Sequence, residues 1–169
     1  MMKNKVLNVL SYVVLGLCLM LFVGSRFVQP ASIKQESMYP TYDDHDVILV
    51  NKVAYKSRTP IKGDIVVFHS DAEGGRDFIK RVIAVSGDTV LITDGKVWVN
   101  GVEQNQDYTA KGLTPGNVDM VVPENTCFVL GDNRTVSIDS RDSSVGCVPY
   151  VDIVGKVLFS EDVVLNGGQ

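Results

Sequence analysis

The 169-residue sequence is poor in the residues that mark a disulfide scaffold, a zinc module or a histidine-based catalytic centre. It has three cysteines and no CxxC pair. Its two histidines, His45 and His69, fit a solvated acidic turn and a strand end better than a catalytic triad. The net charge of -4 argues against nucleic-acid binding. The sequence therefore predicts no metal, no organic cofactor and no nucleic-acid partner.

The composition is that of a folded protein, with 45% hydrophobic and 21% charged residues. The charge is unevenly distributed. Residues 1–28 carry three basic side chains and no acidic one, whereas residues 29–169 carry all 20 acidic residues and the other 13 of the 16 basic ones. This split predicts two parts in two environments.

An uncharged, mostly apolar run extends from Val6 to Gly24. As a helix it would span about 28 Å, close to the hydrocarbon thickness of a bilayer. We expect an uncleaved, single-pass transmembrane anchor rather than a secretory signal, because the run is long for a signal core and Gly24-Ser25-Arg26-Phe27 is a poor cleavage site.

The basic residues on either side of this run set its expected direction. Lys3, Lys5 and the free amino terminus precede it, and Arg26 follows, which favours a cytoplasmic amino terminus. We therefore expect residues 1–28 to form a cytoplasmic tip and membrane anchor, and residues 29–169 an extracytoplasmic domain at the cell membrane, with the lipid bilayer as a partner.

Short β-branched runs separated by turns follow Pro30. The runs predicted to be strands are 46–51, 64–69, 78–85, 89–93, 96–99, 118–122, 126–130 and 153–159. Asp94-Gly95 is a strong hairpin signal, and residues 104–116 are typical of a polar loop. The pattern favours an all-β domain, an antiparallel sandwich or barrel-like fold.

Three segments carry candidate chemistry. Lys80 alternates with apolar residues on the 78–85 strand. Burial can lower the pKa of a lysine toward the value of about 7–8 that suits a general base. Judged from this strand alone, the alternative of a snorkelling lysine, with its amine in water, is favoured. Ser37 precedes Pro40 in an expected turn that would expose its hydroxyl. The alternative is a serine that only caps the backbone of the turn. The third segment, Gly131 to Arg141, is either a surface loop or a structured one, with an Asp139–Arg141 ion pair and a hydrogen bond from Ser137.

Together these segments resemble the type I signal peptidases, membrane-bound serine proteases that remove signal peptides from exported proteins. The matching segments are Ser37 to Thr41 (S-M-Y-P-T), Lys62 to Phe68 (K-G-D-I-V-V-F), Lys80 to Asp88 (K-R-V-I-A-V-S-G-D) and Gly131 to Arg141 (G-D-N-R-T-V-S-I-D-S-R). Their order and the amino-terminal apolar run agree with the family, and the resemblance covers nearly the whole chain.

The resemblance implies a Ser-Lys dyad, with Ser37 as nucleophile and Lys80 as general base. It implies that Ser137 orients the lysine amine, that Asp139 and Arg141 support the site, and that the Ser37 amide donates to the oxyanion. The expected partners are the signal peptides of exported preproteins.

The sequence departs from the family at Gln35, where related enzymes have a small residue. Its amide is either an oxyanion donor or an obstacle to the substrate strand. The loop after Arg141 is also longer than usual. For the shallow pockets that select small residues before the cut, the candidate linings are Ile33, Met38, Phe78 and Ile79.

Two other functions stay open at this point. One is a narrow-specificity processor, for example of a surface-fibre subunit, and the other is a non-catalytic, membrane-tethered domain that binds extended peptides. Cys127 and Cys147 are both expected outside the cytoplasm, where they can form a disulfide, or Cys127 can be a buried thiol.

Overall fold

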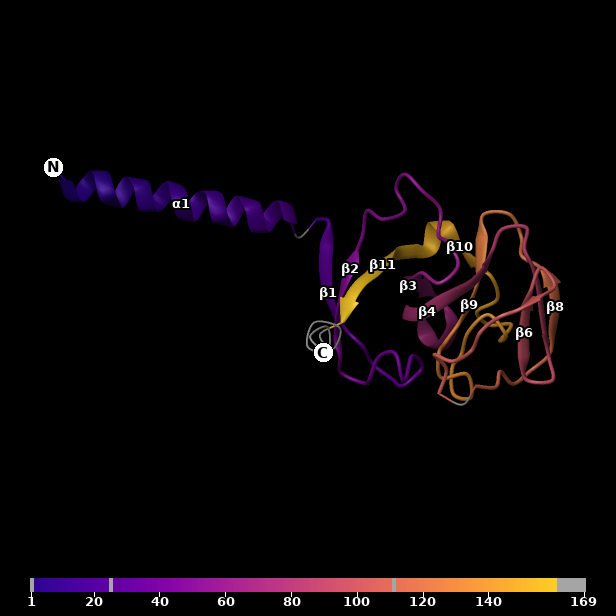
Figure 1. Ribbon diagram of the computed structural model, residues 1–169. Coiled ribbons are helices and arrows are strands. Elements are labelled where there is room, and N and C mark those ends of the chain that lie inside the picture. Colours follow the sequence, from indigo (N-terminus) through magenta and orange to yellow (C-terminus); the bar gives the residue numbers. More distant parts are fainter. Residues whose placement is uncertain (1, 25, 111, 161–169) are drawn as a thin grey trace.

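The computed structural model describes residues 2–24, 26–110 and 112–160 (Figure 1). Ser25, part of the segment judged a poor cleavage site, and residues 161–169 of the expected carboxy-terminal domain lie outside the described residues. The chain begins with the 23-residue helix α1 (Met2–Gly24), which projects away from the β domain (Figure 1). Within the described residues, no helix combines the length and the apolar character needed to cross a membrane.

Two antiparallel sheets form the rest of the described chain, as the short β-branched runs predict (Figure 1). The seven-stranded sheet has the order β1-β2-β11-β3-β4-β9-β10. Its strands are β1 (Val28–Ser32), β2 (Val47–Asn51), β3 (Ile65–Ser70), β4 (Arg76–Val85), β9 (Thr126–Leu130), β10 (Val148–Pro149) and β11 (Ile153–Ser160). The short 3-10 helices η1 (Ala72–Gly74) and η2 (Tyr150–Asp152) connect strands of this sheet.

The four-stranded sheet has the order β7-β6-β5-β8. Its strands are β5 (Thr89–Thr93), β6 (Lys96–Val99), β7 (Val102–Glu103) and β8 (Val118–Val121). The Asp94-Gly95 turn joins β5 to β6 as expected, with positive φ angles of 51° and 77° at its two residues. The all-β prediction is therefore confirmed. The strands β1, β7 and β10 were missed. β7 and β10 have two residues each and carry no readable alternation, and Pro30 interrupts the pattern of β1.

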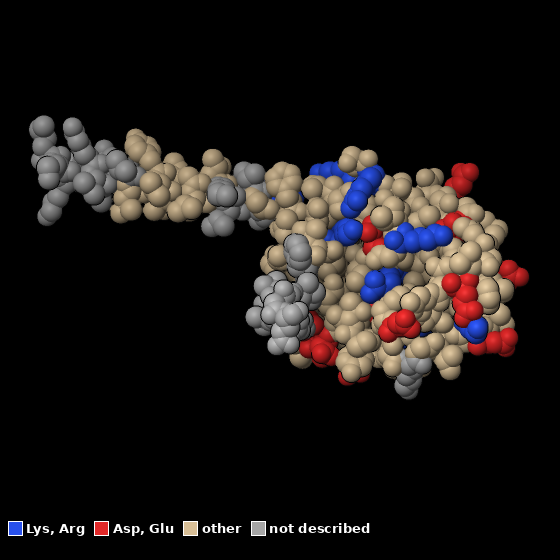
Figure 2. All heavy atoms as spheres, in the orientation of Figure 1, with Lys and Arg blue, Asp and Glu red and all other residues tan. Residues whose placement is uncertain are grey.

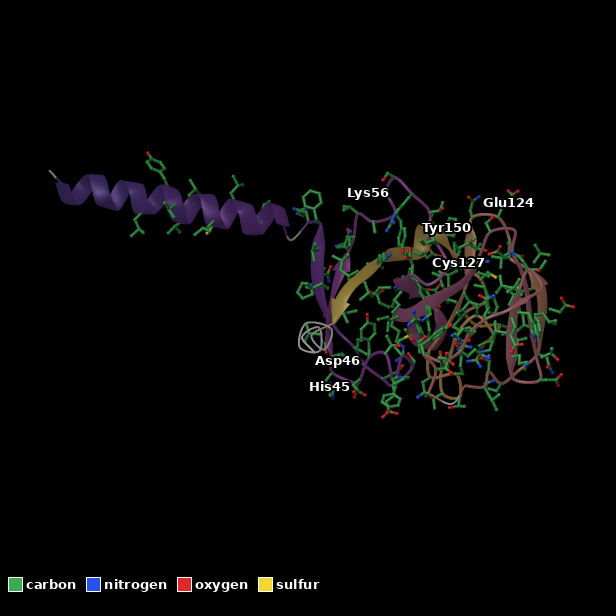
Figure 3. The ribbon with its side chains drawn as sticks, in the orientation of Figure 1. His45, Asp46, Lys56, Glu124, Cys127 and Tyr150 are labelled. Carbon is green, nitrogen blue, oxygen red and sulfur yellow. The ribbon has the colours of Figure 1, made fainter. Side chains whose placement is uncertain are left out.

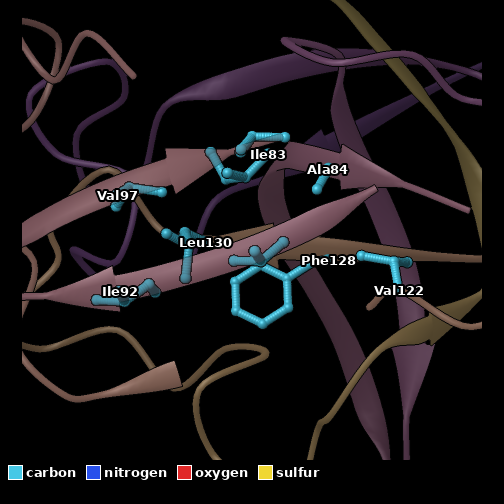
Figure 4. Packing of buried hydrophobic residues seen from close by; sticks show 9 residues of the cluster. Ile83, Ala84, Ile92, Val97, Val122, Phe128 and Leu130 are labelled. Atoms are coloured by element: carbon cyan, nitrogen blue, oxygen red, sulfur yellow. The ribbon is translucent and has the colours of Figure 1, made fainter. Parts of the chain in front are cut away.

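The buried apolar side chains of the two sheets form three core clusters. One cluster joins the four-stranded sheet to β4 and β9 through Ile83, Ala84, Ile92 and Phe128 (Figure 4). A second lies on the other side of β4 and β9 and contains Phe68, Phe78, Val82 and Cys127. A third contains Ile33 and Met38 beside β2. The chemistry-bearing segments are thus attached to well-packed strands.

One detail of β4 differs from simple alternation. The register of β4 against β9 shifts between Val82 and Ala84, which is a β-bulge. Val82 packs in the second cluster, whereas both Ile83 and Ala84 pack in the first. Strict alternation along 78–85 would place Ala84 on the same face as Val82 and Lys80, but the extra residue of the bulge reverses the side-chain direction beyond it.

Candidate active site

The site forms where two segments distant in sequence meet. Ser37 lies on the connection between β1 and β2, and Lys80 lies in the middle of β4. The Lys80 Nζ atom donates to Ser37 Oγ at 2.8 Å and to the Ile79 carbonyl oxygen at 3.0 Å. A nucleophile and a potential base are therefore within hydrogen-bonding distance.

Burial changes the acid–base behaviour of Lys80. Its side chain is only 2% exposed, and this desolvation lowers the lysine pKa to about 8, against a weaker opposing attraction from the Asp139 carboxylate. The amine also lies 5.3 Å from the centre of the Phe78 ring. The snorkelling interpretation is thereby excluded, because a snorkelling lysine would hold its amine in water.

Ser37 is held by a compact turn. The Tyr39 N–H donates to the Glu36 carbonyl and the Tyr42 N–H to the Met38 carbonyl, at 3.1 and 3.0 Å. The Met38 side chain is fully buried in the third core cluster and fixes the turn to the domain. Met38 therefore anchors the nucleophile turn and is not among the residues that line the groove beside it.

The segment after β9 packs against this turn from the other side. The Asn133 N–H donates to the Ser37 carbonyl oxygen at 3.0 Å. A side chain on Gly131 would collide with Ser137 and with the Ser37 carbonyl, so only glycine allows this approach. Ser137 Oγ is buried and has no hydrogen-bond partner in the described part of the chain. The hydrogen bond expected from Ser137 is not formed, since the Lys80 amine donates to Ser37 and Ile79 instead.

The expected ion pair beneath the site is confirmed. Arg141 Nε and one terminal nitrogen each donate to Asp139, both at 2.8 Å. Asp139 also accepts from the Gly131 N–H at 3.0 Å, and Arg141 donates to the carbonyls of Arg134 and Ser137. The segment is consequently a structured loop rather than a plain surface loop.

A second ion pair was missed by the sequence analysis. Arg81 donates to both oxygens of buried Asp132, at 2.9 and 2.7 Å, and its guanidinium also reaches Thr41 of the nucleophile segment. The sequence places a cation on the β4 face opposite Lys80 but does not show which carboxylate lies beside it. The Tyr108 ring lies 4.4 Å from the Arg81 guanidinium and so ties the long polar loop to the site.

A groove of about 460 Å³ runs from the dyad along the sheet. One wall is formed by residues 31–35 and the other by residues 76–80, with Ile48 and Val67 at the floor. Three of the expected pocket residues, Ile33, Phe78 and Ile79, line it. A second hollow of about 360 Å³ continues on the other side of Ser37 and includes Val136 and Ile138.

Gln35 lines both hollows. Its φ angle is 90°, which is uncommon for any residue other than glycine. Its N–H donates to Asp44 Oδ1 at 2.9 Å, and its side chain contacts the Arg76 guanidinium. The sequence identified Gln35 but gave no indication of Arg76, which starts β4.

The histidines and cysteines do not contact the dyad, although His69 lies 3.1 Å from Asp77 of the groove wall. His45 is on the outer edge of the domain, 85% exposed, and pairs with Asp44 (Figure 3). Cys127 is buried inside the domain (Figure 3), and Cys127 and Cys147 are both free thiols. Cys127 packs in the second cluster and Cys147 against the first, on the other side of the sheet, so the possible disulfide is not formed.

Known proteins share this sequence and architecture. The family model described as "Signal peptidase, peptidase S26" matches residues 6–160. Signal peptidase IB of Staphylococcus aureus (strain COL) is 35% identical over 176 residues, which cover 94% of this chain and 90% of that protein. Thylakoidal processing peptidase 1 of Arabidopsis thaliana is 39% identical over 145 residues, which cover 80% of this chain and 42% of that protein.

A solved structure agrees with these relatives. The crystal structure of a signal peptidase I from Enterococcus faecalis superimposes with a TM-score of 0.50 at 30% identity. The match covers 60% of this chain and 98% of that one. The S26 match across most of the sequence and the shared antiparallel fold lead to one conclusion: the chain belongs to the signal peptidase family, peptidase S26.

Proposed function

We propose that this chain is a type I signal peptidase that cleaves signal peptides from exported preproteins with Ser37 as nucleophile and Lys80 as general base. One observation carries the proposal: the amine of Lys80, a residue only 2% exposed, lies 2.8 Å from the Ser37 oxygen in the lining of a groove. Structural lysines are seldom buried without a carboxylate partner, and Lys80 instead contacts a hydroxyl and a carbonyl.

In the acylation step the neutral Lys80 amine removes the Ser37 proton as Oγ attacks the scissile carbonyl. With a pKa of about 8, about one amine in ten is neutral at pH 7, which is sufficient to supply the base. The resulting ammonium then protonates the leaving amine when the peptide bond breaks. The first product leaves, and the signal peptide stays attached to Ser37 as an ester.

In the deacylation step the same amine takes a proton from water, which attacks the ester carbonyl. The ammonium then returns the proton to Ser37 Oγ as the ester bond breaks, which regenerates the neutral amine and the hydroxyl. The Ser37 N–H would donate to the oxyanion in both steps, and loss of one such donor typically costs about 10²–10³ in rate. Ser137, buried beside Gly131 without a hydrogen-bond partner in the described residues, is the candidate to receive or orient the Lys80 amine as it changes protonation.

The groove is suited to an extended peptide. The Ile33 N–H donates to the Asp46 carbonyl, and the Ile33 carbonyl accepts from the His45 N–H. Because backbone groups alternate in direction along an extended chain, those of the neighbouring residues Ser32 and Lys34 point the other way, toward the groove. On the other wall, strand pairing of β4 with β9 begins only at Arg81. A substrate strand can therefore add between the two walls, with its side chains on Ile33, Phe78 and Ile79.

We also propose that residues 1–28 tether the enzyme to the cell membrane as a single pass, with the amino terminus cytoplasmic and residues 29–169 outside. The run from Val6 to Gly24 has no charge, and the described atoms of α1 are neutral in Figure 2, unlike the β domain. Described apolar side chains of α1 such as Leu15 and Leu19 are more than half exposed and need a nonaqueous partner. Carbonate-washed membranes treated with a protease on the outer side test this orientation, because only residues 29–169 should then be digested.

The dyad is tested by cleavage of a preprotein with an A-x-A signal boundary by the detergent-solubilised full chain. We expect Ser37→Ala and Lys80→Ala each to abolish cleavage. Lys80→Arg is the matched control, because it retains a long cation that cannot supply a neutral base. It should be as inactive as Lys80→Ala, and near-normal turnover by any of the three variants would contradict the dyad.

A narrow-specificity processor, for example of a surface-fibre subunit, is the second candidate, and the side chain of Gln35 in the groove favours it. A panel of preproteins distinguishes the two: broad cutting supports a general signal peptidase, and cutting of one class supports the processor. A folded wild type that binds signal peptides and cuts none would instead indicate a non-catalytic binding domain.

A further inference from the structure

The contact between Gln35 and Arg76 joins the two walls of the groove. Gln35 ends the 31–35 wall, and Arg76 begins the 76–80 wall. With its amide oxygen turned toward the guanidinium, Gln35 accepts from both terminal nitrogens of Arg76, at 3.2 and 3.1 Å. This orientation is the chemically sensible one, because a guanidinium offers only donors.

Both partners are held where they meet. The N–H of Gln35 donates to Asp44 Oδ1 at 2.9 Å, which fixes its backbone, and Gln35 lines the groove beside Ser37. The Arg76 guanidinium lies 5.1 Å from the centre of the Phe78 ring, itself a wall residue. The φ of 90° is uncommon for a residue other than glycine, and the surrounding contacts hold Gln35 in it.

An endopeptidase substrate cannot pass beneath such a contact end first. The chain continues on both sides of the scissile bond, with a signal peptide before it and a whole protein after it. It must therefore enter the groove sideways, through the mouth that Gln35 and Arg76 span. Entry separates the two side chains and leaves the guanidinium without the amide oxygen.

We propose that the Gln35–Arg76 contact is a gate across the substrate groove and that it determines specificity, favouring substrates that bring a carboxylate to Arg76 in place of the Gln35 oxygen. This inference rests on the proposed function and adds a selection step to it. A substrate carboxylate forms a charge-assisted bond with the guanidinium, stronger than the neutral amide contact that it replaces. A substrate without an acceptor there opens the gate at a net loss.

The gate is tested by peptide binding in a Ser37→Ala background, which removes cleavage. The probe is a fluorescein-labelled peptide that spans an A-x-A signal boundary, measured by anisotropy with the full chain in detergent. Gln35→Ala removes the contact but keeps a side chain at the same φ, so we expect the Kd to fall several-fold. Gln35→Glu converts the contact to an ion pair, and we expect the Kd to rise about tenfold, with the increase shrinking at high salt.

Two further arms complete the test. Gln104→Ala, in the polar loop away from the groove, is the matched control and should leave the Kd unchanged. In a series of peptides with one glutamate placed at each position before the cleaved bond in turn, one position should bind several-fold tighter. Arg76→Gln should remove that preference.

The outcomes separate the gate from the proposed function. Unchanged Kd values for both Gln35 variants, or weaker binding by both, would overturn the gate. The same two Gln35 variants are also made with Ser37 intact; a loss of kcat in both, with Kd unchanged in the Ser37→Ala background, would identify Gln35 as an oxyanion donor and would likewise overturn the gate. If the wild type cuts no preprotein, but Gln35→Ala lowers the Kd and Gln35→Glu raises it, the gate is retained and the peptidase function is rejected.

Discussion

Gly131 lies directly against the carbonyl of Ser37: a Cβ atom on Gly131 would stand 2.5 Å from that oxygen and 2.2 Å from Ser137 Oγ. Gly131, directly after β9, therefore lies against both Ser37 and Ser137. Because a Cβ atom at these distances forces a shift, the position of the nucleophile depends on the absence of one methyl group.

Gly131→Ala should therefore reduce kcat/KM by about 10² or more, because displacing a nucleophile by about 1 Å has that effect. We expect the thermal midpoint to fall as well. Gly63→Ala is the control: its φ of 86° disfavours alanine, but the added atom meets nothing within 4 Å. It should lower the midpoint slightly and leave cleavage intact. Equal activities of the two variants would refute the packing argument.

Cleavage should increase with pH. Burial lowers the Lys80 pKa to about 8, and only the neutral amine can accept the Ser37 proton. Below pH 8 the amine is mostly charged, so kcat/KM should rise about tenfold per pH unit and level off above pH 8. Because the Arg76 charge further lowers this pKa, Arg76→Gln should move the profile to higher pH. A flat profile between pH 6 and 9 would exclude Lys80 as the base.

Ser137→Ala should separate stability from activity. The buried Ser137 oxygen lacks a hydrogen-bond partner among the described residues, so removing it should leave the free energy of unfolding unchanged or raise it by about 1 kcal/mol. If Ser137 orients the Lys80 amine during the reaction, kcat should fall by about 10². Urea unfolding and single-turnover kinetics on the same preparation measure both. A variant with full activity would remove Ser137 from the mechanism.

Asp139→Ala should be strongly destabilising. Its side chain is fully buried and accepts from Arg141 and from the Gly131 N–H. Removing one partner of a buried ion pair costs about 3–5 kcal/mol, because the remaining charge is left unpaired. Urea unfolding should show this loss. The control is Lys96→Ala, which removes an exposed Lys96–Glu103 pair and should cost no more than about 1 kcal/mol.

The cysteines should all be free. We expect the mass of the intact protein to be the same with and without reductant. Burial raises the Cys127 pKa to about 12, so Cys127 should react with iodoacetamide only after unfolding. Half-buried Cys147 should react sooner. A two-dalton mass difference upon reduction would show a disulfide and would require rearrangement of the β9–β10 pairing.

Most strands and the candidate residues could be predicted from the sequence because local residue patterns determine them. β-branched runs between turn residues determine local structure, and most of the predicted strands agree with the structure within two residues. The Asp139–Arg141 pair was predictable because its partners are two residues apart. The β4 bulge, the Arg81–Asp132 pair and the Gln35–Arg76 contact were not, because each depends on how distant segments align.

By itself the sequence determined which side chains are present and that the chain after α1 forms short antiparallel strands. Only the tertiary structure decided that Lys80 meets Ser37, 43 residues away in sequence, and that its amine is desolvated. It also decided that Met38 is an anchor, that Ser137 has no hydrogen-bond partner among the described residues and that Cys127 and Cys147 lie on opposite sides of a sheet. Burial and proximity belong to the packed chain, and local residue patterns cannot encode them.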